Sequence, residues 1–382
     1  RAHKAMTVSE HSPLLPGSKA AADIRIEPRM PFLDGLRGLA IVMVVLYHAY
    51  VRWPELVPYH GRFQTFPLFA QGWIGVPLFF LLSGYLIART LCRCQGIAEF
   101  CLRRWSRLFP AMVLCSLIIY VTAPLVPERP AGPPEPLSLL PGLTFIDEAW
   151  WAKILGRPVR VLEGSFWTLY TEAKFYISAA CLYFLLGRRA LWLGLSGAFL
   201  LGALGWFLVH PLGLTGFGLA RLDKLVEQLS LLHFGWFAAG SLWFFHAHEP
   251  GKPRLLGVLA WLLCAVSVLV SAELVPAKIV SVTLMPILFV LALRNRTAQR
   301  VLGHPVLLYL GLCSYPLYLL HENLMIALVI KLGPHVPSVL WPLLPLPVVL
   351  GLSVVAYPIA RYFEPPTERF LRTRLFVPRI RA

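Results

Sequence analysis

The sequence predicts an all-α polytopic membrane protein of about ten transmembrane helices, with both termini in the cytoplasm. Of its 382 residues, 57% are hydrophobic and only 14% are charged, whereas about 25% of residues in soluble globular proteins are charged. Apolar stretches also recur along the chain, and many approach the length of about 20 residues that a helix needs to cross a bilayer. Composition and stretch length therefore both indicate a chain that crosses the membrane repeatedly.

Ten apolar stretches can be counted, and each predicts one helix. They are 36–51, 73–91, 111–125, 166–186, 191–209, 229–245, 255–271, 279–293, 314–332 and 343–362. The first is short, so its helix must include the flanking residues. An even number of crossings places both ends of the chain on one side of the membrane.

Positive charges are distributed unequally between the two sides of these predicted helices. The inner segments contain the arginine clusters at 103–107, 294–300 and 361–381, whereas the outer segments hold scattered cations such as Arg62, Lys278 and Lys331. Because Lys and Arg collect in cytoplasmic loops, this asymmetry places both termini inside. Topology then explains most of the net charge of +16, and no nucleic-acid partner is predicted.

The chain divides into three predicted regions. Residues 1–31 are polar and lack the apolar core of a cleavable signal peptide, so we expect a flexible N-terminal tail. Residues 32–362 form the transmembrane domain, with a proline-rich outer loop at 126–164 that either covers a substrate site or is an ordinary surface loop. Residues 363–382 form a basic cytoplasmic tail. The seven cysteines show no disulfide framework and no complete ligand set, so no metal site is predicted.

Arg37 and His48 are the most informative pair of residues. They are eleven positions apart, which is close to three helical turns, so both lie on one helix face about 16 Å apart. Arg37 is a fixed cation, whereas His48 can exchange a proton near neutral pH. The pair therefore predicts that an anion and a proton are handled beside the first helix.

Two acidic residues are candidate partners of this pair. Glu172 lies within the fourth apolar stretch, where an unpaired carboxylate is costly, so we expect it to accept the imidazole N–H of His48 or to pair with Lys174. Asp34 is too far from His48 on a regular helix. It is expected to pair with Arg37 or to cap the start of the first helix.

Five motifs, taken together, resemble the membrane acyltransferase-3 family. They are LDGLRGLA with a histidine ending the first helix, GVPLFFLLSGYLI, RRWSRLFPA, WTLYTEAKFY and SYPLYLLH. The resemblance extends over about residues 32–362, and Pro77 stands where the family often has an acidic residue. It implies an integral-membrane O-acetyltransferase that moves an acyl group, most often acetyl, from cytoplasmic acyl-CoA to a hydroxyl of a glycan, a lipid-linked sugar or a natural-product sugar.

The resemblance also implies roles for single residues. His48 would be the general base, supported by Glu172, because a histidine with a pKa near 7 suits this proton transfer. Arg104, Arg107 and Arg103 would bind the phosphates of acyl-CoA, although inner loops also collect arginine for topology alone. Other residues expected in a substrate cavity, beside Asp34, are Trp167, Tyr315 and His321. Ser83 is expected to pack helices rather than to carry the acyl group.

Several alternatives stay open at this point. Transfer can be direct or through an acyl-enzyme, and a separate acyl-accepting partner can receive the group. The expected location is a bacterial inner (plasma) membrane in contact with its lipid. A lysosomal or vacuolar membrane is less favoured and rests on the sequence EHSPLL near the N-terminus. The competing function is a proton-coupled transporter of a small anion or lipid that uses the same intramembrane His, Glu and Arg groups.

Overall fold

The computed structural model describes residues 30–214, 216–251 and 253–375, which form helices and no β-strand. The predicted N-terminal tail, apart from its last two residues, lies outside the described residues, as does the end of the predicted C-terminal tail. All ten apolar stretches are helical along most of their length. The all-α membrane fold predicted from the sequence is therefore confirmed.

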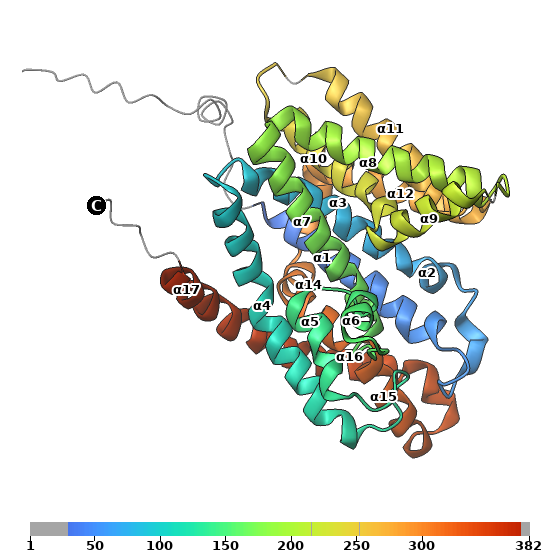
Figure 1. Ribbon diagram of the computed structural model, residues 1–382. Coiled ribbons are helices and arrows are strands. Elements are labelled where there is room, and N and C mark those ends of the chain that lie inside the picture. Colours follow the sequence, from blue (N-terminus) through green and yellow to red (C-terminus); the bar gives the residue numbers. More distant parts are fainter. Residues whose placement is uncertain (1–29, 215, 252, 376–382) are drawn as a thin grey trace, which may run out of the picture.

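Eleven helices of the described chain form the body of the bundle (Figure 1). They are α1 (Pro31–Tyr47), α3 (Gly75–Leu91), α4 (Ile97–Thr122), α7 (Trp167–Leu186), α8 (Arg188–Val209), α10 (Phe234–His248), α11 (Arg254–Ser271), α12 (Pro276–Arg294), α14 (Pro305–Leu320), α15 (Glu322–Leu332) and α16 (Pro345–Pro358). Shorter connecting helices are α2 (Pro67–Ala70), α5 (Leu139–Thr144), α6 (Glu148–Leu155), α9 (Phe217–Gln228), α13 (Arg296–Leu302) and α17 (Glu364–Leu375).

Helix length and apolarity support fewer crossings than the ten predicted. Seven helical segments of the described chain are long and apolar enough to span a membrane, and the bent pair α13 and α14, with an angle of 65°, gives an eighth. The differences have local causes: α10 has only 15 residues, α7 carries Glu172 and Lys174, and the predicted stretch 314–332 is interrupted at His321. The count of ten and the orientation of the termini stay predictions.

Close crossings between helices depend on glycine. A Cβ on Gly84 of α3 would lie 2.1 Å from the carbonyl oxygen of Phe237, and a Cβ on Gly240 of α10 would lie 2.1 Å from that of Leu81. The two glycines therefore let the α3 and α10 backbones approach each other, as small residues commonly do in membrane bundles. This contact forms one wall of the bundle, with α8, α11 and α12 packed outside it (Figure 1).

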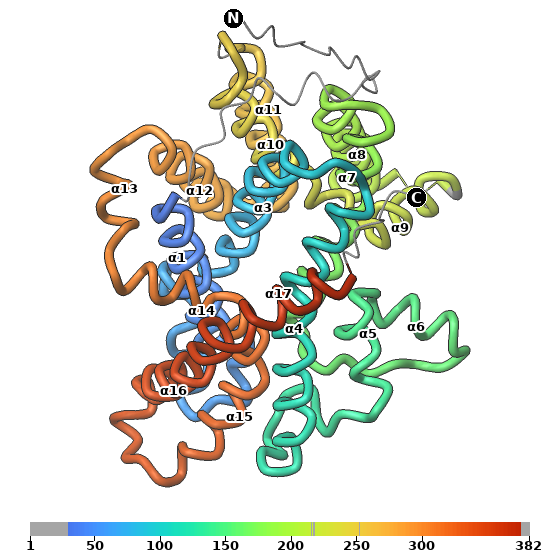
Figure 2. The backbone as a smooth tube through the Cα atoms, turned by 90° about the vertical axis from the view of Figure 1, so that its left-hand side faces the viewer, coloured from blue at the N-terminus to red at the C-terminus, as the bar shows by residue number. Residues whose placement is uncertain are grey.

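The segments at the two ends of the membrane domain also pack on it. The proline-rich loop at 126–164 contains the short helices α5 and α6 and a 3₁₀ turn at Pro136–Ser138, and it is held against the start of α15. At the other end of the chain, α17 lies across α4 (Figure 2). Residues 364–375 of the predicted basic tail therefore form a helix in contact with the domain.

Candidate active site

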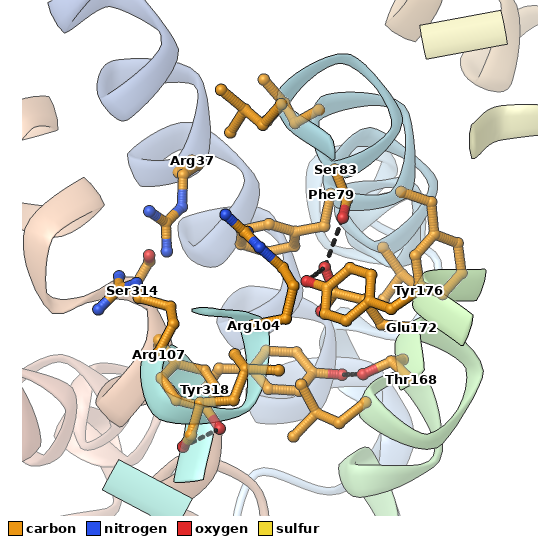
Figure 3. A pocket seen from close by; sticks show the side chains of 17 residues that line it. Arg37, Phe79, Ser83, Arg104, Arg107, Thr168, Glu172, Tyr176, Ser314 and Tyr318 are labelled. Carbon is orange, nitrogen blue, oxygen red and sulfur yellow. Dashed lines mark hydrogen bonds between the residues drawn. The ribbon is translucent and has the colours of Figure 1, made fainter. Parts of the chain in front are cut away.

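A cavity of about 880 Å³, measured with its opening, lies between α1, α3, α4, α7 and α14. Figure 3 shows Arg37, Arg104 and Arg107 on one side of this cavity and the carboxylate of Glu172 on the other. The arginines come from α1 and α4, which are distant in sequence. The structure therefore gathers three of the predicted site cations around one space, together with aromatic walls such as Phe79.

Two of the cavity arginines are held by named partners. A terminal nitrogen of Arg104 donates to the hydroxyl of Thr90 at 3.1 Å, while its Nε is buried without a hydrogen-bond partner. Arg107 forms an ion pair with the buried carboxylate of Glu364 at the start of α17. The cavity therefore contains strong hydrogen-bond donors. The Nε of Arg104 has no hydrogen-bond partner, and the charge of Arg107 is neutralised by Glu364.

Arg103, the third predicted acyl-CoA ligand, is placed elsewhere. It forms an ion pair with Glu99 at 2.5 Å, one turn earlier on α4, and it is not among the residues that line the cavity. Arg104 and Arg107 share the inner face of α4, whereas Arg103 is held by its partner on the same helix. The structure therefore groups two of the three predicted arginines with Arg37.

The expected partners of Glu172 are wrong. Its Oε1 accepts hydrogen bonds from the hydroxyls of Ser83 and Tyr176, both at 2.5 Å. Lys174 instead forms an ion pair with Asp147 at 2.7 Å, because two helical steps place it on a different face of α7 from Glu172. Glu172 is thus a carboxylate satisfied by hydroxyl groups inside the cavity, rather than the partner of His48.

The remaining predicted cavity residues have different positions. Tyr315 lines the cavity, and its hydroxyl donates to the carbonyl oxygen of Leu108 at 2.9 Å. Trp167 is not among the lining residues; it is 41% exposed and contacts the ring of His233. Asp34 does not cap α1, because the helix begins at Pro31 with Met30 as its N-cap residue and Asp34 lies in the first turn.

His48 lies beyond the inner wall of the cavity, next to His321. The wall includes Tyr318, whose hydroxyl bonds to Thr168 at 2.8 Å and donates to the carbonyl oxygen of Ser165 at 3.0 Å. The Tyr318 ring is 5.3 Å from the ring of His321, which is itself 4.7 Å from the ring of His48. The predicted base therefore lies one residue layer away from the cavity that holds the arginines.

Both histidines occupy irregular points of their helices. The regular turns of α1 end at Tyr47, and His48 begins a π-helical segment, His48–Arg52. His321 lies at the junction of α14 and α15, where the helix is interrupted. Such segments are frequent at functional sites because they expose or redirect groups that a regular helix would hold elsewhere. Sequence periodicity alone gives no signal for them.

The carboxylate that faces His48 is Glu322, the residue that follows His321 in the sequence. Glu322 Oε1 is 3.8 Å from His48 Nε2, and the two side chains are only 4% and 13% exposed. Its other oxygen accepts the backbone N–H of Ser165. The one sequence signal for Glu322 as a site residue was its position immediately after His321, inside an apolar stretch.

Behind Glu322, the outer loop is fastened to α15 by buried polar groups. Asn323 donates its backbone N–H to Glu163 at 2.9 Å and its side-chain amide to the same oxygen at 2.6 Å, and Arg129 forms an ion pair with Glu163 at 3.3 Å. Burial and the nearby Glu322 carboxylate raise the pKa of Glu163 to about 8, although Arg129 and Asn323 act in the opposite direction. The outer loop is therefore fastened to α15 next to Glu322, the carboxylate that faces His48.

Comparison with known proteins places the chain in a family. The family described as "Acyltransferase domain" matches residues 30–361. The chain is 36% identical to an O-acetyl transferase of Shigella phage Sf6 over 87 residues, which are 23% of this chain and 25% of that protein. It is 32% identical to the peptidoglycan O-acetyltransferase OatA of Listeria monocytogenes over 98 residues, 24% of this chain and 13% of that protein.

These relatives share only part of their length with the chain, which matches about a quarter or less of each of the two. No solved structure matches the chain significantly. The family match, in contrast, covers nearly all residues that the structure describes and contains the cavity and both histidines. The chain belongs to this family of membrane acyltransferases, as its five motifs predict.

Proposed function

We propose that the protein is an integral-membrane O-acyltransferase that moves an acetyl group from cytoplasmic acetyl-CoA to a hydroxyl of a carbohydrate-containing acceptor. The observation that carries this proposal is the arrangement of one cavity: its arginines lie on one side, and its inner wall at Tyr318 separates it from the half-buried His48 and the buried His321. Acyl transfer from a thioester to an alcohol needs a bound acyl donor and a base that takes the hydroxyl proton; arginines suit the phosphates of acyl-CoA, and a histidine suits the proton.

The arginines are suited to the phosphates of acyl-CoA. Arg37, Arg104 and Arg107 line one space, and planar guanidinium groups bind phosphate oxygens through paired hydrogen bonds. The unpartnered Nε of Arg104 supports this fit, because a buried donor without a partner is costly unless a ligand accepts from it. If the positive-inside prediction holds, these arginines lie on the side from which cytosolic acyl-CoA arrives.

His48 acts as the general base in this proposal. It takes the proton of the acceptor hydroxyl while the hydroxyl oxygen bonds to the thioester carbonyl carbon, the carbon–sulfur bond breaks, and the CoA thiolate leaves and is protonated. Glu322, 3.8 Å from His48 Nε2, stabilises the imidazolium that forms. Glu172 is bonded to Ser83 and Tyr176 in the donor cavity, so its proposed place is beside the acyl group rather than behind the base.

The acceptor is proposed from the relatives. The Listeria relative is named for peptidoglycan, a carbohydrate polymer, and a glycan, glycolipid or glycosylated small molecule would present the same hydroxyl chemistry. The acetyl group goes to this acceptor directly or by way of a separate partner. The proposed location is a bacterial plasma membrane, where lipid surrounds the apolar helices and the donor and acceptor are on opposite sides.

The proposal is tested with purified protein in lipid nanodiscs, offered acetyl-CoA labelled in its acetyl group together with muropeptides or a lipid-linked sugar. We expect a labelled O-acetyl ester on an acceptor. If proteoliposomes instead show proton-coupled movement of an anion and no ester forms with any acceptor, the transporter hypothesis replaces this one.

A binding measurement tests the donor site separately. Replacing Arg104 and Arg107 by alanine is expected to weaken acetyl-CoA binding in calorimetry by at least tenfold, since each lost charge-assisted hydrogen bond contributes about 1.5–3 kcal/mol. Arg254→Ala is the matched control, because Arg254 is exposed at the start of α11 and does not line the cavity. Equal affinity of the double variant and the control would remove the proposed donor site.

A further inference from the structure

The hydrogen bonds of His321 determine which of its nitrogens carries a proton. His321 Nδ1 is 2.8 Å from the carbonyl oxygen of Tyr318, and a carbonyl oxygen can only accept a hydrogen bond. Nδ1 must therefore carry the hydrogen. In a neutral imidazole the second nitrogen, Nε2, is then bare and acts as an acceptor.

The same reasoning extends to His48. Its Nδ1 is 2.9 Å from the carbonyl oxygen of Val44 and 3.2 Å from Nε2 of His321. Both neighbours are acceptors, so Nδ1 of His48 carries a hydrogen and shares it between them. A doubly protonated His321 would point an N–H at the nitrogen that already donates to Val44, so the contacts favour a neutral His321.

These contacts leave only one nitrogen of His48 able to take a proton. That nitrogen, Nε2, faces Glu322 at 3.8 Å, and Glu322 is held from its other oxygen by the backbone of Ser165. An ionised carboxylate has no hydrogen to donate, so Glu322 does not occupy the Nε2 lone pair. An N–H formed there would point toward a carboxylate that stabilises it.

We propose that His321 is a positioning residue, which together with the Val44 carbonyl holds His48 as its Nδ1–H tautomer, so that Nε2 is the proton-accepting atom of the acyl transfer. This proposal rests on the proposed function and deepens it, because it assigns the base to one atom and gives the second buried histidine a role. Tyr318 takes part through its backbone carbonyl oxygen, which accepts the hydrogen bond from His321 Nδ1 and so fixes the imidazole ring. Tyr318 also lines the cavity that holds the arginines.

A spectroscopic measurement tests the tautomer without any activity. Protein labelled with ¹⁵N-histidine is studied in lipid by solid-state NMR, and the His48 signals are assigned from their loss in His48→Asn. We expect a protonated Nδ1 and a bare Nε2 in the wild type, and a larger share of the Nε2–H tautomer in His321→Leu, where only the Val44 carbonyl remains to accept from Nδ1. A wild-type His48 with its hydrogen on Nε2, or an unchanged tautomer in His321→Leu, would overturn the proposal.

Kinetics test the consequence. In His321→Leu we expect kcat to fall on the order of 10²-fold, the lower range of general-base contributions, with an unchanged KM for acetyl-CoA because the arginine cavity is intact. His321→Gln keeps an acceptor atom near His48 and should stay within about tenfold of the wild type, since rescue by an acceptor is the signature of positioning. If His321→Gln is as slow as His321→Leu, the proposal that an acceptor atom at this position orients His48 is wrong.

His248→Leu is the matched control. Like His321, His248 bonds through Nδ1 to a backbone carbonyl, that of Phe244, at 2.9 Å, but it does not contact His48. It should leave both kcat and the His48 signals unchanged, and thermal unfolding checks that each variant is folded. If the wild type shows the expected tautomer but transfers no acetyl group, the proposed function fails while the tautomer assignment stands, so the two failures are distinguishable.

Discussion

At the scale of single residues, Glu163 provides a pH-dependent contact between the outer loop and the membrane domain. Its side chain is fully buried with Arg129 and Asn323, and its pKa is raised to about 8 from an ordinary carboxyl value of 4.5. Between these two values the folded protein binds more protons at this group than the unfolded chain does. The contribution of Glu163 to stability is therefore greatest below pH 4.5 and decreases as the pH rises toward 8.

Thermal unfolding at several pH values checks this prediction. The unfolding temperature of the wild type in detergent should decrease between pH 5 and pH 8, and Glu163→Gln should reduce that decrease because the neutral side chain does not titrate. Glu135→Gln, which changes an exposed carboxylate paired with Arg160, should retain the wild-type slope. Parallel profiles for Glu163→Gln and the wild type would contradict the assignment.

The residue scale also shows where sequence reasoning succeeds and where it stops. The arginines at 37, 104 and 107 were predicted as site residues and do line one cavity. The partner of His48 was predicted wrongly, because Glu172 was judged by its depth in an apolar stretch, whereas the contact with His321 joins residues 273 positions apart. No spacing within one helix encodes such a contact.

At the scale of elements, α17 supplies the ion-pair partner of one of the cavity arginines. Glu364, the first residue of α17, is buried and forms an ion pair with Arg107 of α4, and its second carboxylate oxygen is buried without a hydrogen-bond partner. A donor phosphate would compete with this carboxylate for the same guanidinium. Binding of acetyl-CoA should therefore displace or weaken the contact between α17 and α4.

Glu364→Gln is expected to strengthen acetyl-CoA binding about fivefold, because removing the competing carboxylate from an ion pair whose guanidinium is partly exposed is worth roughly 1 kcal/mol. Calorimetry with acetyl-CoA measures it. The control is Glu368→Gln, which alters the ion pair with Arg372 on the same helix and should leave the affinity unchanged. Weaker binding in Glu364→Gln would mean that the carboxylate orients Arg107 for the donor instead of competing with it.

The crossing of α3 and α10 gives a second prediction at this scale. Gly240→Ala would place a methyl group 2.1 Å from the carbonyl oxygen of Leu81, so the helices must separate, and we expect a loss of about 1–3 kcal/mol of stability. Gly197→Ala in α8 has no atom within 4 Å of the new methyl group and should be neutral or slightly stabilising. Equal unfolding temperatures for the two variants would contradict the close crossing.

Element boundaries were the least predictable part of the fold. Apolar stretches located ten helical segments but not the polar helices α9 and α17, and the π-helical turn at His48 and the interruption at His321 depend on contacts between distant helices. The short helix α10 and the charged helix α7 are held by burial in the bundle. Length and apolarity alone therefore do not show whether α7 and α10 cross the membrane.

At the scale of the whole molecule, the topology is a prediction from charge. Cysteines replacing Arg93 and Arg374, in a background without the seven native cysteines, should be protected from an impermeant thiol reagent applied to intact cells. A cysteine replacing Arg157 in the outer loop should be labelled, because the predicted helices place it on the opposite side. Labelling of Arg93→Cys and Arg374→Cys from different sides would overturn the predicted number of crossings.

The class of the whole molecule was predictable because composition and five motifs extend over the membrane domain. The position of His48 outside the cavity was not. Arg37 and His48 belong to one continuous helical segment, yet Arg37 lines the cavity and His48 lies behind Tyr318. The pair therefore marks the two ends of a proposed transfer path, with the acyl group crossing the Tyr318 layer between them.

The most direct test of this account is acetyl transfer by the wild type and by His48→Ala in nanodiscs, with labelled acetyl-CoA and a muropeptide or lipid-linked sugar acceptor. The account predicts that His48→Ala binds acetyl-CoA with wild-type affinity but transfers acetyl on the order of 10²–10⁴-fold more slowly, the usual contribution of a general base. Transfer by folded His48→Ala at the wild-type rate would contradict it.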